Sequence, residues 1–487
     1  MSTASSPLSQ NSVPASTSTR RDFVRTLARA SLTAVAAPWI IPSGIVRAQD
    51  GTPVPSNRTT FALIGCGNMG PQGLNAVVKN KNAKVIATCD TFRDRAEKIR
   101  DGVDKEYNGK GCTAYQDYRE LLARKDLDCL EIATGDYWHV PLGIAAIRAG
   151  KDIYIEKPLG IAVNWAKVLR DEINKRKAVF QLGTWQRSRP HYRKVCELIR
   201  NGVIGDIKRV EVWGPSLASD GILNPNSNLS KLHRDAEEIA VPATLDYEIW
   251  TGPAAKRPCT RPRLLPDGIY HSTDYAIGYI AGWGVHPVDI AQWGLGADDT
   301  APILYKGTGR TPDTPGLFDT LATWDIECQY ANGTELRFMD WAVAQPIVKK
   351  YLRRARGDGT TFFGTKGWIS VDRTGPQASD PNILKTELPA DAIRLHIDKT
   401  PVEQVAGRKR TWKVDSHWDN FIDCVRTRKP TINPIQSAFN DDIISHLSNI
   451  AARTGRTIKW DPKAETIPDD AEAAKFLDRT PRAPWAF

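Results

Sequence analysis

The chain has 487 residues, of which 41% are hydrophobic and 25% charged, enough for two ordinary globular domains. Its formal charge is +10, but five arginines and one aspartate among the first 48 residues account for +4, and the other basic residues are scattered. No basic block interleaved with aromatic residues is found, so a nucleic-acid partner is not expected. The eight cysteines form no CxxC pair, which argues against a metal site or a disulfide framework.

An export signal is predicted over residues 1–48. The paired arginines Arg20 and Arg21 precede an apolar run over 27–41, and small residues around Ala48 mark a cleavage point. The apolar run is too short and too interrupted by proline to span a membrane. This order resembles a twin-arginine signal, so an exported, periplasmic protein is expected, with residues 49–57 as a linker.

A glycine-rich turn follows the first strand predicted after the linker. The apolar run 59–64 leads directly into a complete G-x-G-x-x-G, Gly65-Cys66-Gly67-Asn68-Met69-Gly70. In this pattern the first glycine permits a tight turn, the second a close approach to a pyrophosphate, and the third close packing of the next helix. The helix N-terminus then offers free N–H groups to phosphates. The predicted dinucleotide contacts are Gly65, Gly67, Asn68, Met69 and Gly70.

Strands and helices alternate beyond this turn. A strand over 84–89 ends at Asp90, whose carboxylate is placed to bind both ribose hydroxyls and therefore favours NAD. Arg93 follows closely enough to leave NADP open. Strands over 127–133 and 151–155, with a helix over 141–149, complete the pattern. Residues 58–176 are therefore expected to form a Rossmann domain with a parallel, doubly wound sheet.

The pattern changes near residue 179, and residues 177–487 are expected to form an α+β substrate-binding and oligomerisation domain. Residues 215–265, rich in Pro, Asn and Ser, predict a long loop excursion. An open, mainly antiparallel sheet is indicated, and two late helices are expected to pack against it or against the Rossmann domain. The ranges are 179–182, 208–213, 321–330, 334–341, 360–363 and 368–371 for strands, and 190–201, 416–427 and 436–454 for helices. No transmembrane helix is predicted.

The strand over 151–155 runs into Glu156-Lys157-Pro158. After a dinucleotide fingerprint, this tripeptide resembles the Gfo/Idh/MocA oxidoreductase family, which includes glucose–fructose oxidoreductase and inositol dehydrogenase. The likeness continues over 133–139, 248–253 and 282–289, and the tail from 458 is similar to an exported subgroup. The resemblance covers roughly residues 58–487.

The resemblance implies roles for single residues. Lys157 would lie between the nicotinamide and the substrate and polarise the reacting oxygen, which suits a cation because an alkoxide develops there. His286 is implied as the general acid/base for the hydroxyl proton. Cofactor contacts are implied for Thr134, His139, Glu156, Lys157 and Trp185.

Position 282 departs from the family pattern, in which an aspartate commonly stands four residues before the histidine. Gly282 can neither bind substrate with a side chain nor assist proton transfer. Asp289 is three residues after His286 and is expected to share its helix face and orient its ring. Asp274, Tyr275 and Tyr279 are the other candidates for the vacated role, and substrate contacts are expected for Tyr279, Trp283 and Asp274, with tryptophan rings stacking on sugar C–H faces.

The leading hypothesis is hydride transfer to or from a secondary hydroxyl or ketone of a sugar, polyol or sugar derivative. One alternative is an NAD-dependent glycoside hydrolase that oxidises its sugar transiently. Another is a non-catalytic sugar-binding relative, which Gly282 motivates. Because free NAD is scarce outside the cytoplasm, tight cofactor retention is expected. The resemblance also implies a homo-oligomer, a dimer or tetramer, formed through the outer face of the second sheet.

Overall fold

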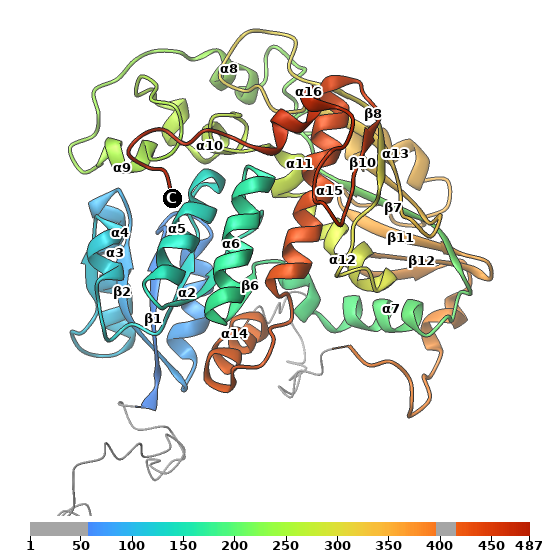
Figure 1. Cartoon of the computed structure of the whole chain (residues 1–487), viewed down its shortest axis with the longest axis horizontal. Helices are drawn as coiled ribbons and strands as arrows, with labels where there is room; N and C mark the ends of the chain where they lie inside the picture. The colour runs from blue at the N-terminus through green and yellow to red at the C-terminus, as the bar shows by residue number, and fades with distance from the viewer. Residues whose placement is uncertain (1–56, 396–414) are drawn as a thin grey trace, which may run out of the picture. The chain divides into compact units, whose positions relative to one another are not determined.

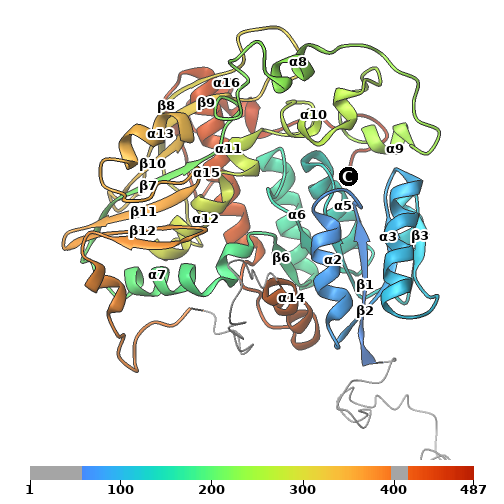
Figure 2. The same ribbon diagram turned by 180° about the vertical axis from the view of Figure 1, so that it is seen from behind.

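The computed structural model describes residues 57–395 and 415–487. The predicted export segment, and the predicted linker up to residue 56, lie outside the described residues. Residues 55–487 belong to one unit of contacts, and its described part carries two β-sheets (Figures 1 and 2).

The first sheet has six parallel strands in the order β3-β2-β1-β4-β5-β6. Its order reverses between β1 and β4, which opens a crevice at the carboxyl ends of these strands. The prediction of a doubly wound parallel sheet is confirmed. The strands are β1 (Thr59–Ile64), β2 (Ala83–Cys89), β3 (Thr113–Tyr115), β4 (Cys129–Ile132), β5 (Asp152–Ile155) and β6 (Phe180–Leu182).

Alternate residues of β1 supply two different cores, since successive side chains of a strand point to opposite faces. Phe61 and Leu63 belong to the core formed with α2 (Gly70–Lys79), α3 (Arg93–Glu106) and α14 (Asp415–Thr427). Ala62 and Ile64 belong to the other core, formed with α4 (Tyr118–Leu122), α5 (Asp136–Arg148) and α6 (Val163–Arg176). The late helix α14 therefore packs beside α2 on the Rossmann domain (Figure 1). From the sequence, the late helices are expected either there or against the second sheet.

The second sheet has the strand order β13-β12-β11-β7-β10-β9-β8-β14. Its pairs are antiparallel except for β7 and β10, which run parallel, so the expected mainly antiparallel sheet is confirmed with one parallel pair. Strands β8, β13 and β14 were not predicted. The strands are β7 (Ile207–Gly214), β8 (Leu304–Arg310), β9 (Thr323–Gln329), β10 (Glu335–Asp340), β11 (Gly359–Gly364), β12 (Gly367–Asp372), β13 (Gly375–Ala378) and β14 (Ile458–Lys459).

Helices cover both faces of the second sheet. α7 (Pro190–Arg200), α12 (Val285–Leu295) and α15 (Ile435–Thr454) contact one face, and α15 also contacts α6 of the first domain. On the other face α13 (Trp341–Val348) packs on Trp213 and Met339. Oligomerisation through this outer face stays a prediction. The remaining elements are η2 (Trp185–Ser188), α8 (Asn228–Arg234), α9 (Tyr247–Thr251), η3 (Pro262–Leu264), α10 (Pro266–Tyr270), α11 (Tyr279–Gly282), η4 (Pro381–Lys385), α16 (Ala471–Ala474) and η5 (Lys475–Leu477).

Two expected boundaries are corrected. The strand near 179–182 pairs with β5 as the edge of the first sheet, so the Rossmann sheet extends beyond residue 176. The helix expected from 141 begins at Asp136 and carries Pro141 in its second turn, where the proline has no N–H to donate to the carbonyl oxygen of Tyr137. Within the described residues no helix is long and apolar enough to cross a membrane.

Candidate active site

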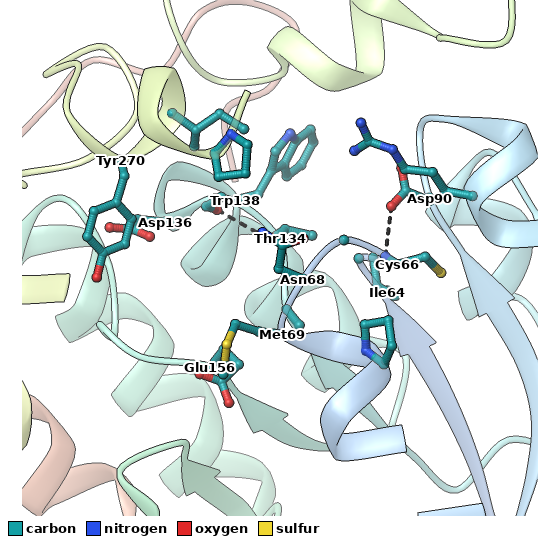
Figure 3. A pocket seen from close by; sticks show the side chains of 18 of the residues that line it. Ile64, Cys66, Asn68, Met69, Asp90, Thr134, Asp136, Trp138, Glu156 and Tyr270 are labelled. Carbon is teal, nitrogen blue, oxygen red and sulfur yellow. Dashed lines mark hydrogen bonds between the residues drawn. The ribbon is translucent and has the colours of Figure 1, made fainter. Parts of the chain in front are cut away.

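A cavity of about 1190 Å³ lies at the carboxyl ends of β1, β2, β4 and β5, where the sheet order reverses (Figure 3). Residues of the second domain close it, so most of the predicted contacts come together from distant parts of the chain. The predicted residues that line it are Gly65, Gly67, Asn68, Met69, Asp90, Thr134, Glu156, Lys157, Trp185, Tyr279, Trp283 and His286.

The glycine-rich loop has the shape that a dinucleotide requires. Gly65 has a φ of +100°, and a Cβ there would lie 2.3 Å from the carbonyl oxygen of Ala133. Gly70 does not line the cavity, because it packs against Gly65, whose oxygen would lie 2.2 Å from a Cβ at 70. A Cβ at Gly67 would meet no atom within 4 Å, which leaves open space beside the loop. The loop therefore fits a bound pyrophosphate, with the uncapped start of α2 behind it.

Asp90 stands at the end of β2 in a fixed orientation. Its Oδ2 accepts a hydrogen bond from the backbone N–H of Cys66 at 2.7 Å, and its Oδ1 accepts one from Phe92 at 2.8 Å. Burial raises the pKa of this carboxyl, while the two hydrogen bonds and Arg95 act in the opposite direction. The cations beside it in the cavity wall are Arg95 and Lys98; Arg93, singled out from the sequence, does not line the cavity.

Glu156 and Lys157 follow β5 at the floor of the cavity. The Oε2 of Glu156 accepts a hydrogen bond from the backbone N–H of Lys157 at 3.3 Å. Burial raises the pKa of the Glu156 carboxyl, and the ammonium of Lys157 opposes that shift. The Nζ of Lys157 lies 5.6 Å from the ring centroid of Tyr270. Lys157 therefore lines the cavity and is only partly exposed to solvent, unlike a lysine in a surface turn.

His286, near the start of α12, is buried between two tryptophans. Its ring lies edge-on to Trp185 and Trp283, with centroids 6.0 and 5.9 Å away. Its Nδ1 has no hydrogen-bond partner within the described residues. Burial, followed by Arg373 and Lys157, holds the pKa of His286 well below its ordinary value, so the ring is neutral. This direction runs against an imidazole that titrates near neutrality, and the general acid/base role of His286 stays a prediction.

Two arginines that the sequence did not single out stand in the same wall. The guanidinium carbon of Arg189 lies 3.8 Å from the centroid of Trp185, and that of Arg373 lies 4.2 Å from the centroid of Trp283. Both residues line the cavity. Together with Lys157 they make the end of the cavity near His286 electropositive.

Three predicted residues lie elsewhere. Asp289 is buried and binds the Nε of Arg187 at 2.7 Å and the amide of Asn433 at 3.1 Å, so it faces this ion pair and not His286. Asp274 pairs with Arg257 and Arg263 at 3.0 and 3.2 Å. His139 lies with its two ring nitrogens against the carbonyl oxygens of Pro158 and Thr134, at 2.7 and 3.2 Å. His139 therefore braces the loops behind the cavity, and none of the three lines it.

The side-chain space above Gly282 is filled by Tyr270. A Cβ at position 282 would lie 2.0 Å from the hydroxyl oxygen of Tyr270 and 2.2 Å from its Cζ. Tyr275, another candidate for the vacated role, instead accepts a hydrogen bond from Arg263 at 3.1 Å. Tyr279 lines the cavity, but its hydroxyl donates a hydrogen bond to the carboxylate of Asp220 at 2.7 Å. The glycine thus makes room for a tyrosine that the sequence did not single out.

Substitution of Gly282 by alanine is expected to destabilise the protein by about 1–3 kcal/mol, because the new methyl group overlaps Tyr270. Thermal or urea unfolding measures the change. In a Tyr270→Ala background the overlap is gone, so the added Gly282→Ala change should cost no further stability. An equal cost in both backgrounds would contradict the placement of Tyr270.

Comparison with known proteins matches both parts of the chain to the domains of one family. Residues 59–184 match the family model described as "Oxidoreductase family, NAD-binding Rossmann fold", and residues 229–345 and 409–487 match its C-terminal alpha/beta domain model. An inositol 2-dehydrogenase of Rhizobium meliloti is 29% identical over 152 residues, 31% of this chain and 44% of that enzyme. The chain spans less than half the length of the first curated relatives it matches.

Solved structures share the fold over almost their whole length. GenD2 from gentamicin A biosynthesis, in complex with NAD, has a TM-score of 0.57 at 16% identity, over 83% of this chain and 97% of that one. The WlbA dehydrogenase of Bordetella pertussis, in complex with NADH and UDP-GlcNAcA, has a TM-score of 0.55 at 14% identity, over 83% and 99%. The chain belongs to the Gfo/Idh/MocA oxidoreductase family, and its first domain is an NAD-binding Rossmann domain.

Proposed function

We propose that this oxidoreductase transfers hydride to or from a secondary hydroxyl or ketone of a sugar, polyol or sugar derivative. The observation that carries the proposal is that Lys157 and a neutral His286 line the same cavity as the glycine-rich loop. The names of the relatives point the same way, since they include an inositol dehydrogenase and a dehydrogenase bound to a UDP-sugar.

Bound NAD supplies the hydride acceptor or donor for this chemistry. The chain's own contribution to holding it would come from the loop Gly65–Gly70, the start of α2 and Asp90. A fixed carboxylate at the end of β2 suits two ribose hydroxyls and repels a 2′-phosphate, which favours NAD over NADP. We expect the cofactor to be retained tightly.

Each residue near the substrate end has a distinct task. The ammonium of Lys157 stabilises negative charge on the reacting oxygen. Neutral His286 can accept a hydrogen bond from a substrate hydroxyl and so orient it. Trp185 and Trp283 flank this imidazole and offer flat apolar faces to a sugar ring.

The experiment that tests the proposal begins with mass spectrometry of nicotinamide cofactor released from purified protein by gentle denaturation. The protein is then incubated with NAD and myo-inositol, glucose or a nitrophenyl glucoside, and NADH and free sugar are measured. Bound NAD with NADH formation supports the proposal. Sugar release without net redox change would favour a glycoside hydrolase, and failure to bind NAD or to turn over any compound would contradict both activities.

We also propose export through a twin-arginine signal, which the order of Arg20, Arg21 and the following apolar run supports. Replacing both arginines by lysine is expected to keep the protein in the cytoplasm, because the paired guanidinium groups are what the signal presents. Cell fractionation measures the distribution. The matched control replaces Arg25 and Arg29 by lysine, and unchanged periplasmic yield in the first variant would contradict the signal.

A further inference from the structure

Asp136 is a buried carboxylate in the cavity wall that the roles described above do not use. It is the first residue of α5, and its Oδ2 has no hydrogen-bond partner within the described residues. The side chain lines the cavity close to Tyr270 (Figure 3). Burying a carboxylate without a partner is costly, so such a group is kept protonated or satisfied by a ligand.

Tyr270 brings a hydroxyl group to the same place. Its ring fills the space above Gly282 and lies 5.6 Å from the Nζ of Lys157. The side chain lines the cavity, and its hydroxyl forms no hydrogen bond with another described residue. Burial raises the pKa of Tyr270, and the negative charge of Asp136 raises it further. The hydroxyl therefore keeps its proton and acts as a donor.

We propose that Asp136 and Tyr270 form the proton-transfer site for the reacting hydroxyl, with Asp136 as its general base and Tyr270 as a hydrogen-bond donor beside Lys157. This inference rests on the proposed function, since the proton in question is the one that oxidation of a secondary alcohol releases. It replaces His286 as the proton acceptor, because a ring held neutral by its surroundings is a weak base.

In the direction of alcohol oxidation, the O–H bond of the substrate breaks and its proton goes to the carboxylate of Asp136. The bonding pair becomes the second bond of the carbonyl. The C–H bond breaks at the same carbon, which is oxidised, and its hydrogen leaves with both electrons to NAD, the oxidant of this family's activity. Lys157 and Tyr270 donate hydrogen bonds to the oxygen while its charge grows.

The electrostatic surroundings suit Asp136 to this task. Burial raises the pKa of its carboxyl from 3.8 to about 7; Lys157 after β5 lowers it, and Asp442 from α15 raises it. Tyr270 of α10 also lies close to Asp136, and its hydroxyl stays protonated. A general base is most effective when its pKa is near the working pH.

The kinetic test compares Asp136→Asn and Tyr270→Phe with the wild type, using NAD and myo-inositol as the probe. Asp136→Asn is expected to lower kcat by about 10²- to 10⁴-fold and to abolish the rise of kcat/KM through pH 7. Tyr270→Phe should lower kcat by about 100-fold and leave that rise in place. Loss of rate in Asp136→Asn with the same pH profile as the wild type would overturn the role of Asp136.

A second measurement does not depend on turnover. Because the pKa of Asp136 is higher in the folded protein than its ordinary value of 3.8, the folded state loses stability as the pH rises from 3.8 to about 7. The asparagine variant does not titrate. The melting temperature of this variant should therefore rise relative to that of the wild type across that window. The difference between the two melting temperatures should stay constant at higher pH. A difference that does not change with pH would overturn the proposal.

Two matched variants control for the chemical change alone. Tyr351→Phe removes a hydroxyl that bonds Glu211 at 2.7 Å, and Asp325→Asn removes a carboxylate that pairs with Arg337 at 2.7 Å. Neither residue lines the cavity, so turnover and its pH profile should not change. If the wild type oxidises none of the probes, the proposed function fails, whereas the melting experiment still decides whether Asp136 exchanges its proton near pH 7.

Discussion

Lys157→Met is expected to lower kcat by about 10³-fold while NAD binds as it does to the wild type. The reason is the position of the ammonium group, which lies in the cavity beside Asp136, Tyr270 and His286. Methionine keeps the apolar stem but leaves the reacting oxygen without a fixed positive charge. The contacts expected for the pyrophosphate and the ribose come from the glycine-rich loop and Asp90, so these contacts remain when Nζ is lost.

The same substitution should change the pH dependence of the remaining activity. The positive charge of Lys157 lowers the pKa of both Asp136 and Glu156. Without it the pKa of Asp136 rises above about 7, so the base loses its proton only at higher pH. The rise of kcat/KM for alcohol oxidation should therefore move to higher pH.

Steady-state kinetics over a range of pH, with NAD binding by calorimetry, measures both effects. The control is Lys208→Met, since Lys208 is exposed on β7 and pairs only loosely with Asp206 at 4.0 Å. Turnover of Lys157→Met at the wild-type rate would remove this residue from the mechanism. A loss of NAD binding equal to the loss of rate would instead make it a cofactor contact.

The Rossmann half of the protein could be read from the sequence because its signals are local. The apolar run over 59–64 coincides with β1, and the glycine motif that follows forms the expected turn. Gly70 packs on Gly65 and on Leu63 just before the motif, and Gly65 packs on Ala133 after the neighbouring strand β4, so the motif and its adjacent strands contain most of the information. The fold of this half then places Asp90 and Lys157 at one edge of the sheet.

The substrate end was harder because its residues depend on contacts between distant segments. Asp289 was expected to orient His286, but α12 is buried on all sides, so spacing along the helix could not show that Asp289 faces Arg187. Tyr270 follows the irregular stretch 215–265 and reaches the site only when α10 packs over α11. Gly282 was the one available signal, because a glycine beside the expected histidine leaves space for another side chain.

Asp136 was overlooked for a different reason. It stands in the segment 133–139 that resembles the family, in which the resemblance implies roles for Thr134 and His139 but none for Asp136. An aspartate at the start of a helix is ordinarily explained by the helix dipole. Its burial and its unpartnered oxygen become visible only when the second domain closes over α5.

Gly67→Ala is expected to raise the Kd for NAD by about 10- to 100-fold without lowering the melting temperature. In the protein itself a Cβ at this position meets nothing within 4 Å, and the backbone there does not have a positive φ. The methyl group is therefore harmless to the fold. It occupies the space into which the pyrophosphate must come, so the cost falls on binding alone.

Calorimetric titration with NAD, together with thermal unfolding, separates the two effects. Gly102→Ala is the matched control, because Gly102 also has open space at its Cβ position but lies in α3, outside the cavity. That variant should bind NAD normally and gain about 0.5–1 kcal/mol of stability, since alanine favours the helix. Normal NAD binding by Gly67→Ala would mean that the pyrophosphate does not pass over this loop, whereas a large loss of stability would mean that the space beside Gly67 is filled by the chain itself.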